Sequence, residues 1–374
     1  MIPGSTPSAS LVLDVGHRSS SHRNGMLTVL KQSKKTLFTS DPGNATITRY
    51  AVQGDYSLKS EGSASIPASC NTTKFNTLRL IPSGQAPYSI FGSASTGDCS
   101  IIFSTPVAGS HAIRSREFAG DIRSLAWTSS GRHLHALDSH ASSSPSTSIF
   151  NFFIAEDPTL NDQKETDILA NVTGAEQMVT HPTGNLVYVV SKITNELITV
   201  PLGGQTGVNG SALPKRYNIL PSSIDGSLYT TSSVAISASK TTLWTLSQSE
   251  VQAVISVFDL NASTGEVVGA VARAAWSGVG GIGAGQIAPA PFIEKDMIAV
   301  ADSPVGMVAI LGLEKTAPAT KSGADERVVN IDGDGFLDEV WTLQGARNGA
   351  TVKLKSYGRI DLGLDHVGES AWVD

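Results

Sequence analysis

The sequence has few charged residues, few aromatic residues and only two cysteines. Of its 374 residues, 16% are Asp, Glu, Lys or Arg and 6% are aromatic. The formal net charge of −6 argues against a nucleic-acid-binding protein, which needs a basic face to neutralise phosphates. The sequence also lacks an apolar run of about 18 residues, so no membrane-spanning segment is expected.

Glycine, serine and apolar residues are plentiful in the chain. It contains 36 Gly and 17 Pro, and 40% of its residues are hydrophobic, which is enough for a substantial core. Disordered chains are poor in apolar residues, so a folded protein is expected. No segment shows a sustained helical stripe of apolar residues, and the composition favours a turn-rich, all-β fold.

The two cysteines and five glycosylation motifs favour the secretory pathway. Cys70 and Cys99 lack metal-site spacing and either form a disulfide or stay as two buried thiols. A disulfide would contribute about 3 kcal/mol through loop entropy. Asn-x-Ser/Thr motifs suit a secreted or extracellular glycoprotein. Residues 1–5 show no signal peptide, so we expect this chain to start after a removed signal. The motif asparagines are Asn44, Asn71, Asn171, Asn209 and Asn261.

A repeated phrase recurs about every fifty residues, at the spacing of β-propeller blades. Each copy is an apolar strand, a turn rich in Ser, Gly, Lys or Pro, and a second apolar strand. A third strand follows in most copies, for example at residues 45–50 and 254–258. The second strands are anchored at Leu37, Tyr88, Leu134, Val187, Leu243 and Met297.

This period predicts an all-β, seven-bladed propeller that forms one domain over residues 1–374. Residues 369–374 and 11–16 are expected to pair as strands of the seventh blade and so to close the ring. Residues 314–350 are expected to form a long loop insertion between strands.

Three other patterns were weighed as ligand sites, and none is strong. The glycine-rich segment 278–285 lacks the strand–helix setting of a dinucleotide site. Residues 330–339 resemble a calcium loop, but the twelfth position is Trp341 where a Glu is needed. His133 and His135, with His140, could contribute to a metal site, although surface or packing roles are favoured. No metal and no cofactor is therefore expected.

Three segments resemble the fungal carboxymuconate cyclase-like propeller family. They are Gln85-Ala-Pro-Tyr88, Thr180-His-Pro-Thr-Gly-Asn-Leu-Val-Tyr-Val and Ser370-Ala-Trp-Val-Asp374. The resemblance implies a seven-bladed propeller with a pocket at one mouth of its channel. The reference activity of the family is lactonisation of a carboxylated muconate gripped by basic side chains.

This chain departs from the family at the positions of those catalytic groups. Arg123 stands at a family histidine, Glu176 at an arginine and Lys192 at a glutamate. Gln248 falls near a further arginine, and Gly283 falls near a histidine. Losing arginines and gaining Glu176 removes a clamp for dicarboxylates, because Glu176 would repel an anion.

Relatives in this family include hetero-Diels–Alderases of tropolone-sesquiterpenoid biosynthesis, and the resemblance implies such a pericyclase as the first hypothesis. That reaction joins a quinone methide to a terpene alkene and needs positioning and a hydrogen-bond donor. Carboxymuconate cyclase and a non-catalytic secreted surface antigen are the alternatives. The expected ligand is a small apolar molecule. The candidate catalytic donors are Arg123, Lys192, Gln248 and Gln286, and the candidate substrate-binding residues are Glu176, Gln177, Trp127, Trp244, Trp276 and Met297.

Overall fold

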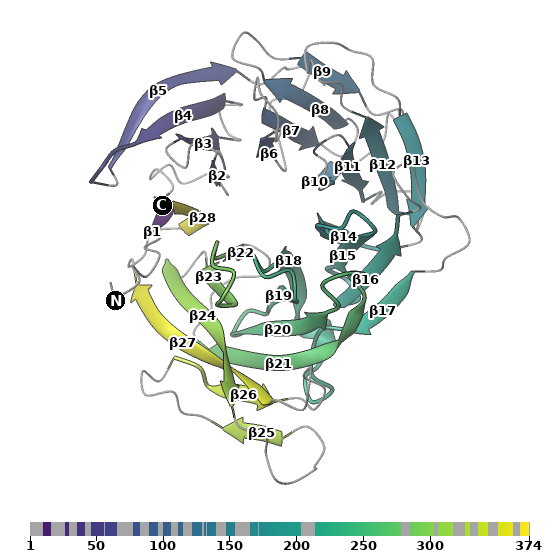
Figure 1. Ribbon diagram of the computed structural model, residues 1–374, viewed down its shortest axis with the longest axis vertical. Helices are drawn as coiled ribbons and strands as arrows, with labels where there is room; N and C mark the ends of the chain where they lie inside the picture. The colour runs from purple at the N-terminus through teal and green to yellow at the C-terminus, as the bar shows by residue number, and fades with distance from the viewer. Residues whose placement is uncertain are drawn as a thin grey trace, which may run out of the picture.

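The protein is an all-β propeller, as seen in a computed structural model (Figure 1). Within the described part of the chain, the one regular element that is not a strand is the 3₁₀ helix η2 (Gly226–Leu228). No helix in that part is long and apolar enough to cross a membrane. The structure describes residues 10–15, 27–29, 36–41, 46–55, 57–65, 78–82, 90–95, 100–105, 111–114, 122–128, 131, 133–139, 147–153, 165–170, 172–202, 214–277, 285–302, 306–316, 326–329, 336–342, 351–361 and 367–373.

Five sheets in the described part of the chain have four antiparallel strands each. They stand around a common centre, and in each sheet the strand that comes first in the sequence lies innermost (Figure 1). The five sheets are β2 (Leu27–Val29), β3 (Thr36–Asp41), β4 (Thr46–Val52) and β5 (Leu58–Ser65); β6 (Leu78–Pro82), β7 (Ile90–Ser95), β8 (Ser100–Thr105) and β9 (His111–Arg114); β10 (Ile122–Trp127), β11 (His133–Asp138), β12 (Thr147–Phe153) and β13 (Glu165–Ala170); β14 (Ala175–Thr180), β15 (Leu186–Ser191), β16 (Glu196–Pro201) and β17 (Lys215–Asn218); and β22 (Gln286–Pro289), β23 (Met297–Asp302), β24 (Met307–Thr316) and β27 (Thr351–Asp361).

Two further sheets depart from this pattern. Residues 314–350 were expected to form a loop, but they contain a two-stranded hairpin. This hairpin adds two strands to the outer edge of β21 and makes a six-stranded sheet. The two ends of the chain contribute one strand each, and these pair in a two-stranded sheet. The strands are β18 (Thr230–Ile236), β19 (Thr242–Gln248), β20 (Gln252–Leu260), β21 (Val267–Ser277), β25 (Glu326–Val329) and β26 (Glu339–Thr342), and then β1 (Ser10–Val15) and β28 (Val367–Val373).

The prediction of a propeller is therefore confirmed, but the prediction of seven regular blades is not. Among the described residues, five sheets are four-stranded blades, because the inserted hairpin enlarges one sheet and the termini supply a single strand each. Leu11 does lie opposite Trp372 in the β1–β28 pair. Closure of the ring by this pair stays a prediction.

The fifty-residue repeat corresponds to the sheets of the structure. Leu37, Leu134, Val187, Leu243 and Met297 each lie in the second strand of a sheet. The sixth anchor, Tyr88, lies outside the described residues. The anchors are apolar because the second strand of a blade has neighbouring sheets on both faces.

The hydrophobic core lies in layers between adjacent sheets. All six residues of β15 are buried, because neighbouring sheets cover both of its faces. By contrast, all eight residues of β5, an outermost strand, are exposed. The layer between the β10 and β14 sheets includes Leu137, Ile149, Met178, Val187 and Ile198, and the layer between the β14 and β18 sheets includes Tyr188, Leu197, Val234, Leu243 and Phe258.

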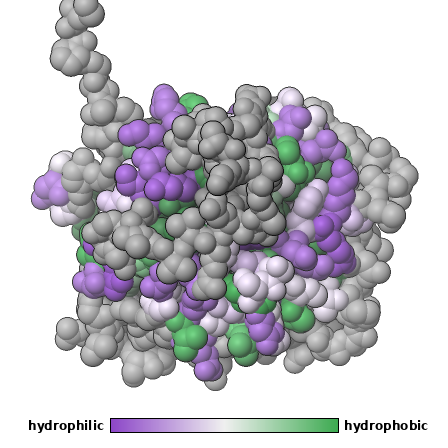
Figure 2. Space-filling model, turned by 90° about the horizontal axis from the view of Figure 1, so that it is seen from below, coloured by the Kyte–Doolittle hydropathy of each residue, from purple (hydrophilic) through white to green (hydrophobic). Residues whose placement is uncertain are grey.

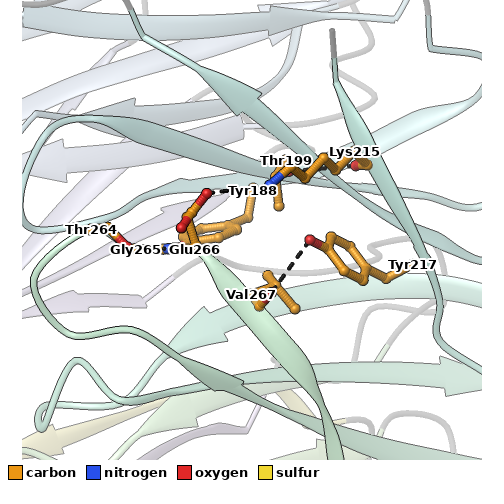
Figure 3. A network of polar contacts seen from close by, with 8 residues as sticks. All are labelled: Tyr188, Thr199, Lys215, Tyr217, Thr264, Gly265, Glu266 and Val267. Atoms are coloured by element: carbon orange, nitrogen blue, oxygen red, sulfur yellow. Dashed lines mark hydrogen bonds and ion pairs between the residues drawn. The ribbon is translucent and has the colours of Figure 1, made fainter. Parts of the chain in front are cut away.

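Polar contacts join the β14–β17 sheet to the turn between β20 and β21 (Figure 3). Tyr188 Oη donates a hydrogen bond to the Gly265 carbonyl, and Tyr217 Oη donates one to the Val267 carbonyl at 3.4 Å. Gly265 has a φ of +78°, and a Cβ atom there would lie 2.8 Å from His181 Cγ. Glycine is needed at this turn for both its backbone conformation and the close approach.

The outer surface is mixed in character. On the side seen in Figure 2, coloured hydrophobic residues are interspersed with hydrophilic ones. Among the described residues, the exposed large hydrophobic side chains come from several separate elements, including Ile193, Val251, Val268 and Ile360. Single exposed apolar side chains are ordinary on soluble proteins and carry no functional argument.

Trp372 connects the terminal sheet to the β22–β27 sheet, and we expect its removal to destabilise the fold. Its Nε1 atom donates to the Ala288 carbonyl at 3.0 Å, and its ring packs edge-on against Phe292 at 5.9 Å between centroids. Trp372→Ala should lower the free energy of unfolding by about 2–3 kcal/mol, because it loses both contacts of a partly buried side chain.

Trp372→Phe is the matched control, since it keeps an aromatic ring and loses the hydrogen bond. Its expected cost is about 1 kcal/mol. Urea denaturation followed by circular dichroism measures both variants. Wild-type stability in Trp372→Ala would mean that the terminal sheet does not support the rest of the propeller.

Candidate functional site

Three neighbouring inner strands carry a β-bulge at the same place, close to where each strand begins. The pairing register shifts around residue 123 in β10, residue 176 in β14 and residue 232 in β18. The bulged residues are Arg123, Glu176 and Ser232. Bulges change the direction of a side chain and are over-represented next to functional sites. These three side chains thus share one end of adjacent inner strands.

Other polar residues gather at this end of the inner strands. Lys192 follows β15, whose last residue pairs with the first residue of β14, and Lys192 N donates to the Gly174 carbonyl at 2.8 Å. Gln248 ends β19 opposite the start of β18, and Gln286 begins β22. We call this group the inner rim, and it comprises Arg123, Glu176, Gln177, Lys192, Ser232, Ser233, Gln248, Gly285 and Gln286.

Glu176 lies between two cations at the inner rim. Its Oε2 atom is 3.2 Å from Lys192 Nζ, and its Oε1 atom is 3.9 Å from Arg123 Nη1. The side chains of Glu176 and Arg123 are each 21% exposed, and that of Lys192 is 35% exposed. Glu176 Oε2 is buried and accepts no hydrogen bond from the described residues. A buried carboxylate oxygen of this kind is able to accept a hydrogen bond from a hydroxyl group of a ligand.

The amide side chains of the rim join neighbouring inner strands. Gln177 Oε1 accepts a hydrogen bond from Val234 N at 2.6 Å, which connects β14 to β18. Gln286 Oε1 accepts one from Ser233 Oγ at 3.3 Å, which connects β22 to β18. Gln286 remains partly exposed at the rim. These contacts hold adjacent blades in register at the site.

Gln248 contacts the backbone of the rim, and its predicted role as a donor to substrate stays a prediction. It is fully buried, and its Oε1 atom accepts a hydrogen bond from Gly285 N at 2.8 Å. The Gly285 carbonyl in turn accepts one from Ser232 Oγ at 3.1 Å. A Cβ atom at Gly285 would lie 2.7 Å from Gln248 Oε1, so a glycine is needed here. Gln248 therefore fixes the chain just before Gln286.

The predicted apolar walls of the site lie elsewhere. Trp244 and Trp276 are fully buried in the core, and Trp276 packs against Phe336 with ring centroids 5.3 Å apart. Trp127 is the last residue of β10, and Met297 is the first residue of β23. Each lies at the end of its strand that is remote from the rim. The strands are long enough to separate these side chains from Arg123 and Gln286. The described rim is thus polar and charged.

Ser232 and Gly285 are rim residues that the sequence analysis missed. Arg123 and Glu176 each stand two positions before an apolar residue in the first strand of their blade, Leu125 or Met178, and we call such residues first-strand anchors. The same offset from Val234 and Ile287 gives Ser232 and Gly285. Aligning the repeats on these anchors would have found both residues.

The histidine pair of β11 has a structural environment. His133 Nδ1 lies 3.2 Å from Asn151 Oδ1, and His135 is buried. Burial, and next the charge of His133, lower the pKa of His135 to about 4. In the part of the chain that the structure describes, no group of three His, Cys, Asp or Glu side chains is placed to hold a metal ion.

Several predicted features lie outside the described residues. They are Cys70 and Cys99, residue 283 in the glycine-rich segment, His140, and residues 330–335 of the segment that resembles a calcium loop. Of the five glycosylation motifs, only Asn261 is described. It is exposed in the turn after β20, as a glycan acceptor must be, and its Oδ1 atom accepts hydrogen bonds from Ser263. Secretion and glycosylation at all five asparagines, Asn44, Asn71, Asn171, Asn209 and Asn261, stay predictions.

Comparison with known proteins identifies the fold. No family model and no curated protein matches the sequence. The chain is similar to the solved structure of a periplasmic gluconolactonase from Pseudomonas aeruginosa, with 14% identity, a TM-score of 0.64, and coverage of 96% of this chain and 90% of that one. It is also similar to a Bacteroides fragilis protein provisionally assigned as a 6-phosphogluconolactonase, with 13% identity, a TM-score of 0.56, and coverage of 93% and 86%.

A protein from Lactobacillus plantarum gives a similar result, with 10% identity, a TM-score of 0.56, and coverage of 93% and 87%. At such low identity the likeness shows the fold alone. The predicted relation to the carboxymuconate cyclase-like family is not established by these neighbours, whereas the propeller is.

The stability of the protein should fall in acid because His135 is buried in its neutral form. Its pKa is lower in the folded chain than in the unfolded chain, so stability is present above pH about 6.5 and is lost as the pH falls towards 4. Over this window the wild type should lose on the order of 3 kcal/mol more than His135→Leu, whose side chain does not titrate.

Urea denaturation at several pH values measures this difference. His133→Gln keeps a hydrogen-bonding side chain opposite Asn151 and removes the smaller cause of the shift, so it should keep most of the wild-type pH dependence, because burial is the larger cause. An identical pH dependence in the wild type and His135→Leu would contradict the assignment of a buried neutral imidazole.

Proposed function

We propose that this protein is an enzyme that opens lactone rings at the inner rim. The observation that carries the proposal is the position of Glu176 between Lys192 and Arg123. A carboxylate that can accept a proton next to two cations that can stabilise an oxyanion suits ester chemistry at a ring. This arrangement needs neither a nucleophilic side chain nor a metal.

During ring opening, Glu176 accepts a proton from water as the water oxygen attacks the lactone carbonyl carbon. Lys192 and Arg123 stabilise the negative charge that forms on the carbonyl oxygen. The ring C–O bond then breaks, and the proton passes from Glu176 to the departing alkoxide oxygen. The product is a hydroxy acid.

The remaining rim residues hold the substrate and the inner strands. Gln286 is partly exposed at the rim and offers amide hydrogen-bonding groups to ring hydroxyls or ring oxygens. Ser232 and Gln248 are buried and hold the backbone before Gln286 in place. Gln177 fixes β14 against β18 next to Glu176.

The structural neighbours support this choice of chemistry by analogy of fold. The Pseudomonas aeruginosa neighbour is named a gluconolactonase, and the Bacteroides fragilis neighbour is provisionally assigned to a related lactonase activity. A shared fold does not by itself transfer an activity. The argument for this chain therefore rests on its own rim residues.

The hetero-Diels–Alder hypothesis has less support from the described geometry. That reaction requires an apolar cavity for two partners, and two of the expected wall residues, Trp244 and Trp276, are fully buried in the core. Lys192 and Arg123 would still serve as donors to an electron-poor partner. Pericyclase activity, and likewise a non-catalytic surface role, stay predictions beside the lactone proposal.

The proposal is tested by assaying the purified protein with uncharged γ- and δ-lactones, including glucono-1,5-lactone, and by measuring proton release above the spontaneous rate. Glu176→Gln should lower kcat by about 100-fold or more, because loss of a general base typically has this effect. Lys192→Met should also lower kcat, since it removes one of the cations that stabilise the oxyanion.

Glu196→Gln is the matched control for the glutamate substitution. Glu196 is similarly exposed at 22% and pairs with Arg216 at 2.7 Å, but it lies in the third strand of its sheet, away from the inner rim. Its variant should keep wild-type kcat. Lactone hydrolysis no faster than in buffer, or full activity in Glu176→Gln, would refute the proposed function.

A further inference from the structure

Lys192 and Arg123 contact the same carboxylate from two different sheets. Lys192 belongs to the sheet of β14–β17, and Arg123 belongs to the sheet of β10–β13. A cation from each side is a common way for a protein to hold a substrate carboxylate or phosphate. Here the carboxylate between the two cations belongs to the protein itself.

We propose that Glu176 is an internal anion that occupies this cation pair and so excludes anionic substrates. The inference rests on the proposed function and narrows its substrate class to uncharged lactones. A substrate carboxylate at the same place would have to displace Glu176 or lie next to it, and like charges at contact distance repel each other. An uncharged carbonyl oxygen meets no such repulsion.

The backbone around Glu176 keeps its carboxylate at this place. Ala175 on one side is fully buried, and Gln177 on the other side accepts the 2.6 Å hydrogen bond from Val234 N. Glu176 is the unpaired, bulged residue between them, and both of its neighbours pair with β15. Because both neighbours are held in place, the backbone at Glu176 has little freedom to move and carry the carboxylate away from the cation pair.

The charges of the rim lead to the same conclusion. With Glu176 ionised, its carboxylate occupies the position between the two cations at which a ligand anion would bind. When Glu176 is replaced by Gln, both positive charges remain and the shape of the side chain is nearly unchanged. Glu176→Gln should therefore convert the rim into a site that binds a small carboxylate.

The experiment is a calorimetric titration of succinate into the wild type and variants at pH 7 and low ionic strength, because salt screens charges that are partly exposed. Glu176→Gln should bind succinate at least about tenfold more tightly than the wild type. Glu176→Asp keeps the negative charge and should bind no better than the wild type, and Glu196→Gln should behave in the same way.

The double variant Glu176→Gln/Lys192→Met should lose the gained binding, which locates succinate at the rim. Circular dichroism verifies that each variant is folded, and Glu176→Ala replaces Glu176→Gln if the latter fails to fold. Succinate binding to the wild type as tight as to the variant, or no gain in either Glu176→Gln or Glu176→Ala, would overturn the proposal.

Lactone turnover is measured separately on the same wild-type preparation. A gain of succinate binding in Glu176→Gln together with an inactive wild type would overturn the proposed lactone activity and uphold the internal anion. An active wild type with no gain in the variant would overturn only the internal anion.

Discussion

Each sheet of this protein must cover both of its faces with neighbouring sheets, and the rest of the architecture depends on this constraint. A sheet of four short strands does not form a stable core alone. Packing side by side buries strands such as β15 completely, and leaves outermost strands such as β5 exposed. The same packing brings the starts of consecutive inner strands together. The polar rim is therefore a consequence of the burial of apolar side chains between the sheets.

At the rim, small departures from regular pairing determine the chemistry. A bulge at the same position in three inner strands presents an arginine, a glutamate and a serine in turn. The two charged side chains, together with Lys192, form a group that is partly shielded from water, where ion pairs are stronger than on an open surface. The amide side chains of Gln177, which is partly buried, and Gln248, which is fully buried, keep the strands in place.

Much of the fold was predictable from the sequence, because a repeat of apolar strands and turns specifies blades directly. The anchors Leu134, Val187 and Leu243 were placed correctly for this reason. Two strands within residues 314–350 were missed, since short strands such as β25 and β26 depend on β21 for their pairing. Seven equal blades were not found because strand number in a sheet depends on these tertiary additions.

The site was predictable only in part. The resemblance to the carboxymuconate cyclase-like family was sufficient to select Arg123, Glu176 and Lys192, which do lie together. It was not sufficient to separate a tryptophan in a core layer from one at a channel mouth, because both occur in strands with apolar neighbours. Trp244 and Trp276 were therefore assigned to the site although they belong to the core. Whether an amide such as Gln248 contacts a ligand or the backbone also depends on tertiary contacts.

The central claim is that Glu176 and Lys192, from different parts of the β14–β15 hairpin, interact directly at the inner rim. A double-mutant cycle on the free energy of unfolding, with Glu176→Gln and Lys192→Met singly and together, measures this interaction. We expect a coupling free energy of about 0.5–1 kcal/mol, the range for a partly exposed ion pair. Strictly additive effects of the two substitutions would contradict the account.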